Sequence, residues 1–230
     1  MPKKHTEARK PKEKSPFDVN KFHDLKALSD YLWGLWGSEK KPLKDKDYIR
    51  YIESETFGMK VQDFILQTRG VKVVNECLCM IELTSHQALK SITTYRGFNE
   101  SVMAARMHEE TDVEEIALTM ELMAKVFPLG VEIVVEQSPA FDFGAFVEKL
   151  NNEPDMDKII HSLDRISRNS MSVAKDILDS SFFDVDKFAG KLKSSSASGD
   201  FLSFIRRISP TAADLVESSS SGGGEYLGSE

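Results

Sequence analysis

The most regular hydrophobic pattern in the chain lies between residues 111 and 128, where apolar side chains recur every three or four positions. This spacing places them on one face of an α-helix. Thr111 followed by Glu114 has the form of a capping box, and Pro128 with Gly130 is typical of a helix end. The sequence therefore predicts an amphipathic helix that packs on a core. Its apolar stripe consists of Val113, Ile116, Ala117, Met120, Met123, Ala124 and Phe127.

A second regular pattern runs from residue 154 to about 180, with apolar positions separated alternately by three and four residues. It is a heptad seam interrupted by the polar Ser170. Two interpretations remain open: the helix packs on its own domain, or it pairs with a second copy or with another protein. The candidate self-association residues are Met156, Ile159, Leu163, Ile166, Val173 and Ile177.

Two further segments have the composition or alternation of extended strands. In 71–83 the apolar side chains fall on one strand face, although Leu78, Ile81 and Ala88 also fit a helix. The segment 131–137, VEIVVEQ, is rich in β-branched residues. The expected fold class is therefore mainly α (α+β), a helical domain with a small β-sheet built from these two segments.

Changes in composition divide the chain into five parts. Residues 1–17 form a basic arm that we expect to be disordered, and 18–192 form a single compact, mainly helical domain. The sequence KSSSASGD at 193–200 predicts a flexible linker, 201–216 a short helical appendage, and the acidic, Ser/Gly-rich 217–230 a disordered tail. No pattern recurs at a fixed period of about 20–50 residues, so a solenoid is not expected.

Charge is distributed unevenly along the chain. The formal net charge is −7, yet residues 1–50 contain 13 Lys/Arg against 8 Asp/Glu and carry +5, which leaves −12 for the remainder. A basic arm can contact phosphate groups, an anionic membrane surface or the acidic body of a second copy, or it can remain a solvated tail. The cations of the arm are Lys3, Lys4, Arg9, Lys10, Lys12 and Lys14.

A second group of cations follows Trp33 and Trp36 and interleaves with Tyr48 and Tyr51. Basic groups neutralise phosphates and aromatic faces stack on unpaired bases, so RNA or DNA binding by the N-terminal 50 residues is an alternative function. Interspersed acidic residues and a pI of about 5.4 argue against it. The second group consists of Lys40, Lys41, Lys44, Lys46 and Arg50.

The commonest catalytic signatures are missing, including the nucleophile elbow, the P-loop and the dinucleotide fingerprint. The best enzymatic candidate is His108–Glu109–Glu110, whose imidazole and carboxylates are groups that bind metals or transfer protons. The same acidic residues also suit the start of the helix that follows. Cys77 and Cys79 are too close for an ordinary disulfide and lack a second pair for zinc, so we expect reduced thiols in the core and no cofactor.

Reduced thiols favour an intracellular location, cytoplasmic or nuclear. No segment approaches the roughly 20 apolar residues that span a bilayer. The basic arm, acidic body, heptad helix and Ser/Glu-rich tail together resemble the organisation of small viral structural or accessory proteins, which would add the virion as a location. The leading hypothesis is a non-enzymatic, self-assembling structural or adaptor protein. Nucleic-acid packaging is the first alternative, and a metal-dependent enzyme centred on the His108 cluster is the second.

Overall fold

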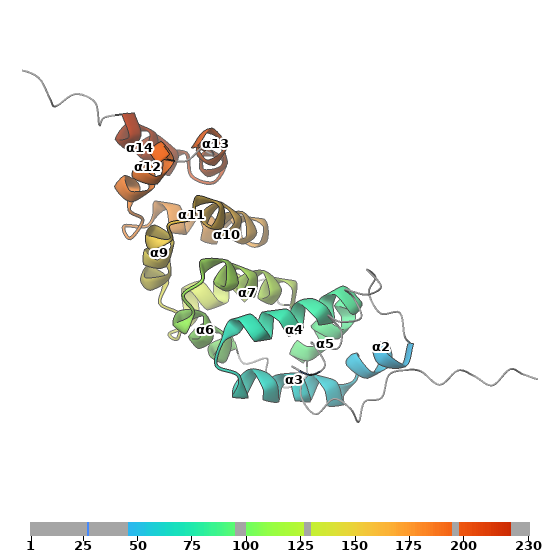
Figure 1. Cartoon of the computed structure of the whole chain (residues 1–230). Helices are drawn as coiled ribbons and strands as arrows, with labels where there is room; N and C mark the ends of the chain where they lie inside the picture. Colours follow the sequence, from blue (N-terminus) through green and yellow to red (C-terminus); the bar gives the residue numbers. More distant parts are fainter. Residues whose placement is uncertain (1–26, 28–45, 95–99, 127–129, 195–197, 222–230) are drawn as a thin grey trace, which may run out of the picture.

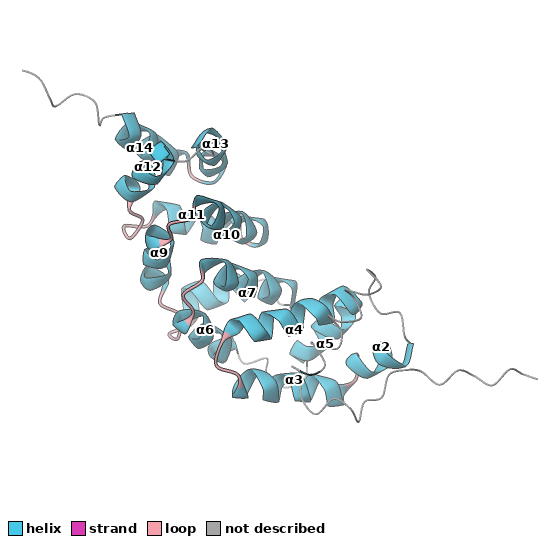
Figure 2. Ribbon diagram, in the orientation of Figure 1, coloured by secondary structure: helices cyan, strands magenta, loops and turns pink. Residues whose placement is uncertain are grey.

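A computed structural model of the chain describes Ala27 and residues 46–94, 100–126, 130–194 and 198–221 (Figure 1). Within these residues the regular secondary structure is helical and includes no strand (Figure 2). The mainly helical class is therefore confirmed, and the predicted small β-sheet is wrong.

Both segments predicted as strands are helical. Residues 71–83 lie in α4 (Val71–Thr84), whereas 131–137 lie in the short α8 (Gly130–Glu132) and in the π-helical turns that continue it, η2 (Ile133–Gln137). The buried side chains of α4 follow helical spacing, as Val71, Val74, Leu78 and Ile81 show. Packing of this continuous stripe on the core outweighs the β propensity of valine and isoleucine.

The helices form a three-helix unit that repeats four times. The units begin at residues 55, 100, 143 and 185, so the period is 42–45 residues. Their members are α3 (Glu55–Gln67), α4 and α5 (His86–Thr94); α6 (Glu100–Glu109), α7 (Val113–Val126) and α8 with η2; α9 (Phe143–Asn152), α10 (Met156–Asn169) and α11 (Met171–Asp179); and α12 (Val185–Ser194), α13 (Ser198–Ile208) and α14 (Pro210–Ser221). The short α2 (Lys46–Ile52) precedes the first unit. The units follow one another in an elongated array (Figure 1), which is a solenoid architecture, contrary to the expectation from the sequence.

A single serine joins the second helix to the third in three of the units. The N–H groups of Ser85, Ser170 and Ser209 donate to the carbonyl of the isoleucine four residues earlier, at 2.7–2.8 Å. Each hydroxyl oxygen accepts the N–H three residues later, at 3.1–3.3 Å. One serine therefore closes one helix and caps the next, and its extended backbone turns the chain between them.

The first helices of the third and fourth units share the sequence Asp-x-x-x-Phe-x-x-Lys-Leu, at 142–150 and 184–192. The carboxylates of Asp142 and Asp184 accept the N–H three residues later, at 2.9 and 3.0 Å, and so cap the helices. Phe146 and Phe188 are buried at the equivalent position. The two helices thus dock on the core through the same residues, one period apart.

One continuous hydrophobic core runs through all four units, from Ile52 to Val216. The whole heptad seam lies in this core, because each of its six candidate self-association residues is buried within the chain itself. Ser170 divides the predicted long helix into α10 and α11. The stripe therefore packs on its own domain, and pairing with a second copy through these side chains would require α10 to separate from α7.

The C-terminal boundaries differ from those expected. Residues 193–194 end α12 and residues 198–200 begin α13, so most of the predicted linker is helical. Residues 217–221 continue α14, which corrects the start of the predicted disordered tail. Here the hydroxyls of Ser218, Ser220 and Ser221 donate to carbonyls one turn earlier, at 2.7–2.9 Å. The basic arm and residues 222–230 lie outside the described residues.

Candidate protein-binding groove at the third unit junction

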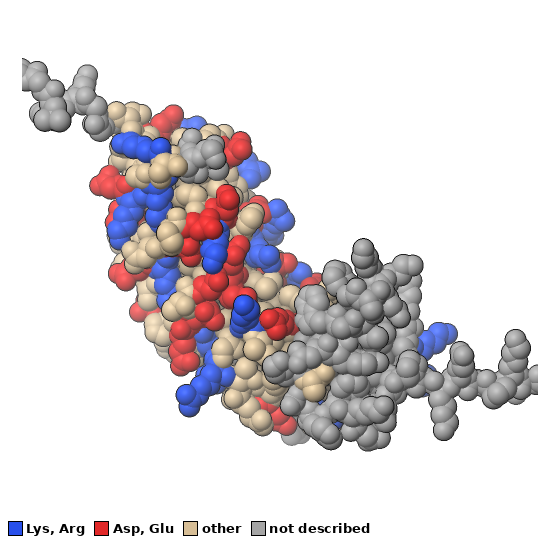
Figure 3. Space-filling model, viewed as in Figure 1, with Lys and Arg blue, Asp and Glu red and all other residues tan. Residues whose placement is uncertain are grey.

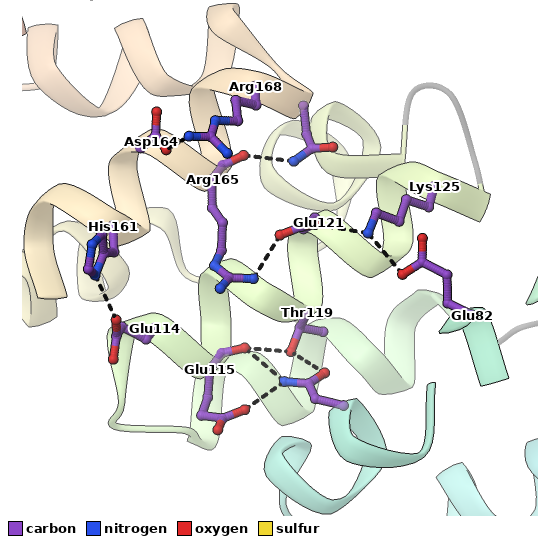
Figure 4. Close-up of polar contacts among 12 residues, drawn as sticks. Glu82, Glu114, Glu115, Thr119, Glu121, Lys125, His161, Asp164, Arg165 and Arg168 are labelled. Atoms are coloured by element: carbon purple, nitrogen blue, oxygen red, sulfur yellow. Dashed lines mark hydrogen bonds and ion pairs between the residues drawn. The ribbon is translucent and has the colours of Figure 1, made fainter. Parts of the chain in front are cut away.

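The second helices of neighbouring units are α4, α7, α10 and α13, and charged side chains cross the first two of the three junctions between them. At the first junction, Lys125 Nζ on α7 lies 2.9 Å from Glu82 Oε2 on α4 and 2.9 Å from Glu121 Oε1 in its own helix (Figure 4). Partial burial opposes the charge on Lys125, but hydrogen bonds to both carboxylates raise its pKa above the ordinary value. Lys125 therefore stays charged and bridges two units.

A buried amide reinforces the first junction. Asn75 on α4 is buried, and its Nδ2 donates to the carbonyl oxygen of Glu115 at 3.0 Å and to its Oε2 at 2.9 Å. Its Oδ1 accepts a hydrogen bond from Thr119 Oγ1 at 3.0 Å. Because the amide of Asn75 finds partners on α7, it fixes the register of the two helices without leaving a buried polar group unpaired.

The second junction is closed in the same way. Arg165 Nη1 on α10 lies 2.8 Å from Glu121 Oε2 on α7, so that Glu121 belongs to both junctions (Figure 4). The ion pair of Lys158 with Asp112, the residue before α7, at 3.3 Å and a contact of 3.5 Å between His161 Nδ1 and Glu114 Oε1 also cross this junction. The first three units are therefore held in register by a ladder of charges in addition to the core.

The third junction is open at the corresponding place. A groove with a volume of about 400 Å³ lies between the end of α10, the start of α11 and the end of α13. Met171 leaves 54% of its surface exposed there. The groove is lined by Asp164, Ser167, Arg168, Met171, Arg207 and Ile208.

Equivalent positions carry different residues at the first and the third junction. Lys125, Arg168 and Arg207 are each the second-last residue of their helix. The partner of Lys125, Glu82, is the third-last residue of α4, the second helix of the preceding unit. The unit before Arg207 has α10 as its second helix, and the third-last residue of α10 is Ser167. Arg207 thus faces a serine where Lys125 meets a carboxylate; at the second junction the same position holds Ala124, and Arg165 makes the contact from one turn earlier. Arg207 has no ion-pair partner within the described residues.

The groove carries an excess of positive charge. Arg168 pairs with Asp164 in its own helix, so these two charges balance. The guanidinium of Arg207 lies 5.4 Å from the centre of the Phe204 ring, which orients the cation without neutralising it. An exposed methionine beside an unpaired arginine is suited to a ligand that offers an apolar side chain next to a carboxylate.

A second hollow, with a volume of about 370 Å³, lies between α9 and the turn that joins α11 to α12. Phe182 is 51% exposed there, and its ring lies against Gly144, where an added Cβ would be 3.1 Å from ring atoms. The buried Asn151 donates to the Phe182 carbonyl oxygen at 2.6 Å and accepts the N–H of Asp184 at 3.1 Å. The polar groups of this hollow therefore brace a turn, which favours a structural role.

A lysine of the repeated nine-residue motif links neighbouring units. Lys149 Nζ donates to the His108 carbonyl oxygen at the end of α6. Lys191 Nζ donates to the carbonyl oxygens of Asn151, at 2.7 Å, and Glu153, at 2.6 Å, at the end of α9. Burial lowers the pKa of both lysines. Equivalent side chains thus close the C-terminal end of the preceding unit's first helix.

Replacing Lys191 with methionine is expected to lower the free energy of unfolding by about 1–2 kcal/mol at neutral pH, because two carbonyl groups lose a charged donor. The pKa of Lys191 in the folded chain lies below the value of 10.5 in the unfolded chain. At pH values between these two pKa values, the unfolded chain therefore binds more protons than the folded chain. The wild type should therefore gain stability over the variant as pH rises toward about 10.5. Urea unfolding across this pH range measures the difference.

The matched control for that prediction is Lys193→Met on the same helix, where the lysine is exposed. It should change the free energy of unfolding by less than about 0.5 kcal/mol. A difference between wild type and the Lys191 variant that stays constant with pH would show that the charge of Lys191 is not desolvated.

The predicted enzymatic cluster has structural roles. The carboxylate of Glu110 accepts the N–H groups of the two residues that follow it, at 2.8 and 3.1 Å, just before α7. Glu109 pairs with Arg106 at 3.6 Å, and His108 is exposed. Among the described residues, no three His, Cys, Asp or Glu side chains are grouped so that they could hold a metal ion.

The other candidates named from the sequence are distributed as follows. Cys77 is buried and Cys79 is partly buried on α4, and burial together with Glu82 raises the pKa of Cys79 to about 11. This thiol is therefore protonated at neutral pH. Of the eleven cations predicted to bind nucleic acid, Lys46 and Arg50 are exposed on α2, and the other nine lie outside the described residues.

Comparisons with known protein families, with curated proteins and with solved structures find no match to this chain. In the part of the chain that the structure describes, none of the helices is long and apolar enough to span a bilayer. The function has to be inferred from the repeat units and the groove themselves.

Proposed function

We propose that this chain is a non-enzymatic helical scaffold that associates with further copies of itself and offers its surface to other proteins. The observation that carries the proposal is the fourfold repetition of the three-helix unit, which builds an extended surface. Stacked helical units characteristically use such a surface to bind proteins. The proposal keeps the self-assembling or adaptor role expected from the sequence.

The placement of the charged residues supports a scaffold. Ionisable side chains such as Lys125, Glu121 and Arg165 join the units, and the carboxylates of Asp142 and Asp184 cap helices. On the described part of one face, acidic and basic side chains are interspersed (Figure 3). A mixed surface of this kind favours protein partners over a phosphate backbone, for which a continuous basic stripe is typical.

Two contacts between copies are proposed. The basic arm, residues 1–17, has the charge to meet the acidic remainder of a second copy, residues 51–230, which carries −12. The open third junction offers an apolar and cationic groove. The seam of α10 and α11 is already buried, so it contributes stability to each copy.

The proposal is tested by the light-scattering mass of the purified full chain at low and at high salt, with the 260/280 nm absorbance ratio read on the same peak. We expect a mass well above 25.9 kDa at low salt and a smaller mass at high salt, because screening shortens the range of charge interactions from about 10 Å at 0.1 M to about 3 Å at 1 M. A mass of 25.9 kDa in both buffers at every concentration would overturn self-association.

The absorbance ratio tests for bound nucleic acid, and a variant of the basic arm tests whether the arm carries the contact between copies. A high absorbance ratio that falls with salt would move nucleic-acid packaging to first place. A variant with the six Lys and Arg of residues 1–14 replaced by glutamine should become monomeric if the arm carries the contact. If that variant still associates, the contact lies elsewhere on the chain.

A further inference from the structure

We propose that the acidic segment 222–230 of a second copy binds in the groove at the third junction, with the carboxylate of Glu225 on Arg207. This inference rests on the proposed self-association and names the surface that carries it. At the first junction, Lys125 is neutralised by Glu82 of the neighbouring unit. At the third junction, the corresponding carboxylate is supplied by another chain.

The chemistry of the segment complements that of the groove. The sequence GGGEYLGSE contains two glutamates and no basic residue, and Tyr226 and Leu227 follow Glu225 directly. A carboxylate beside two apolar side chains matches Arg207 beside the exposed Met171.

A second copy is taken as the source of the segment because the proposed function is self-association. Glu225 lies four residues beyond Ser221, so its Cα can reach at most about 14 Å from that residue, whereas a segment from another copy has no such restriction. A segment bound in its own chain would leave the protein monomeric, so the light-scattering mass separates the two sources.

A contact between the end of one copy and the groove of the next joins two different surfaces. Such a contact leaves a free groove at one end and a free segment at the other, so copies can be added without limit unless the arrangement closes into a ring. The mass of the assembly should therefore increase with protein concentration. A contact between identical surfaces would instead reach a constant dimer mass.

The test is a charge exchange in the full chain, measured as light-scattering mass against concentration. Arg207→Glu and Glu225→Arg should each weaken association by about tenfold or more, because each places like charges in contact. The double variant Arg207→Glu/Glu225→Arg should recover the association of the wild type, and an equal mixture of the two single variants should recover it in part. Circular dichroism confirms that each variant is folded.

The matched control is Lys193→Glu, which makes the same change of net charge in the same unit at an exposed residue outside the groove. It should associate like the wild type. If folded Arg207→Glu also associates like the wild type, or if the double variant remains as weak as the single ones, the inference is overturned while self-association stands. A wild type that is monomeric throughout overturns both.

Discussion

A chain in which Leu163 is replaced by aspartate is expected not to fold. Leu163 lies fully buried on α10, the helix that packs most extensively on α7. An aspartate there would place a carboxylate in an apolar environment and would leave a cavity as well. The combined cost exceeds about 5 kcal/mol, which is comparable with the entire stability of many domains, about 5–15 kcal/mol. Circular dichroism of the purified protein should show a large loss of helix.

The matched control is Leu215→Asp on α14, where 52% of the leucine is exposed. The same chemical change at this position should leave the free energy of unfolding within about 0.5 kcal/mol of the wild type. The comparison also decides between the two interpretations of the heptad pattern. A Leu163→Asp chain that folds normally but no longer associates would show that the seam is an interface after all.

Local signals predicted part of the fold correctly. The helix expected at 111–128 is α7, because its apolar stripe is unbroken and helix-ending residues follow it. The predicted capping residue, Thr111, is wrong: the carboxylate of Asp112 accepts the N–H of Glu114 at 3.0 Å and caps the helix. Several polar residues suited to capping stand side by side there, and the sequence alone does not rank them.

The sequence does not show the repeat directly, because the period of the repeat varies. The units begin 45, 43 and 42 residues apart, and the serine junctions of the last two units are only 39 residues apart. A search at one fixed period therefore finds little. Two short signals would have found it: the motif shared by 142–150 and 184–192, and isoleucine four residues before Ser85, Ser170 and Ser209. Both reflect packing and capping demands that recur in every unit, whatever the length of the loops.

The groove could not be predicted from local sequence at all. The segment at 201–208 predicts an amphipathic helix with Arg206 and Arg207 on its outer side. The structure gives the two neighbours different roles: Arg206 lies 2.6 Å from Glu217 and 3.5 Å from Asp214 on α14, whereas Arg207 faces the groove. Such a difference depends on which helix lies beside each side chain, and it becomes visible only when the units are compared position by position.

Replacement of Phe188 by alanine is expected to lower the free energy of unfolding by about 3–5 kcal/mol. Phe188 is fully buried on α12, with ring centres 4.4 Å from Phe183 and 6.1 Å from Phe201, so it connects the turn before α12 with α13. Its removal leaves a cavity at the centre of the fourth unit. The matched control is Phe182→Ala, which removes a half-exposed ring and should cost less than about 1 kcal/mol.

The position of the fourth unit in the array determines which helices open first when the Phe188→Ala substitution lowers the stability. In a stacked array each unit is stabilised by its neighbours, and the last of the four described units packs mainly on the third. We therefore expect α12, α13 and α14 to open first in the Phe188→Ala chain, with faster amide hydrogen exchange there than in α4 and α7. Because α13 forms one wall of the groove, self-association should fall together with that protection. If all helices instead exchange together in a single transition, the four units form one cooperative body, and the groove cannot be opened without unfolding the whole chain.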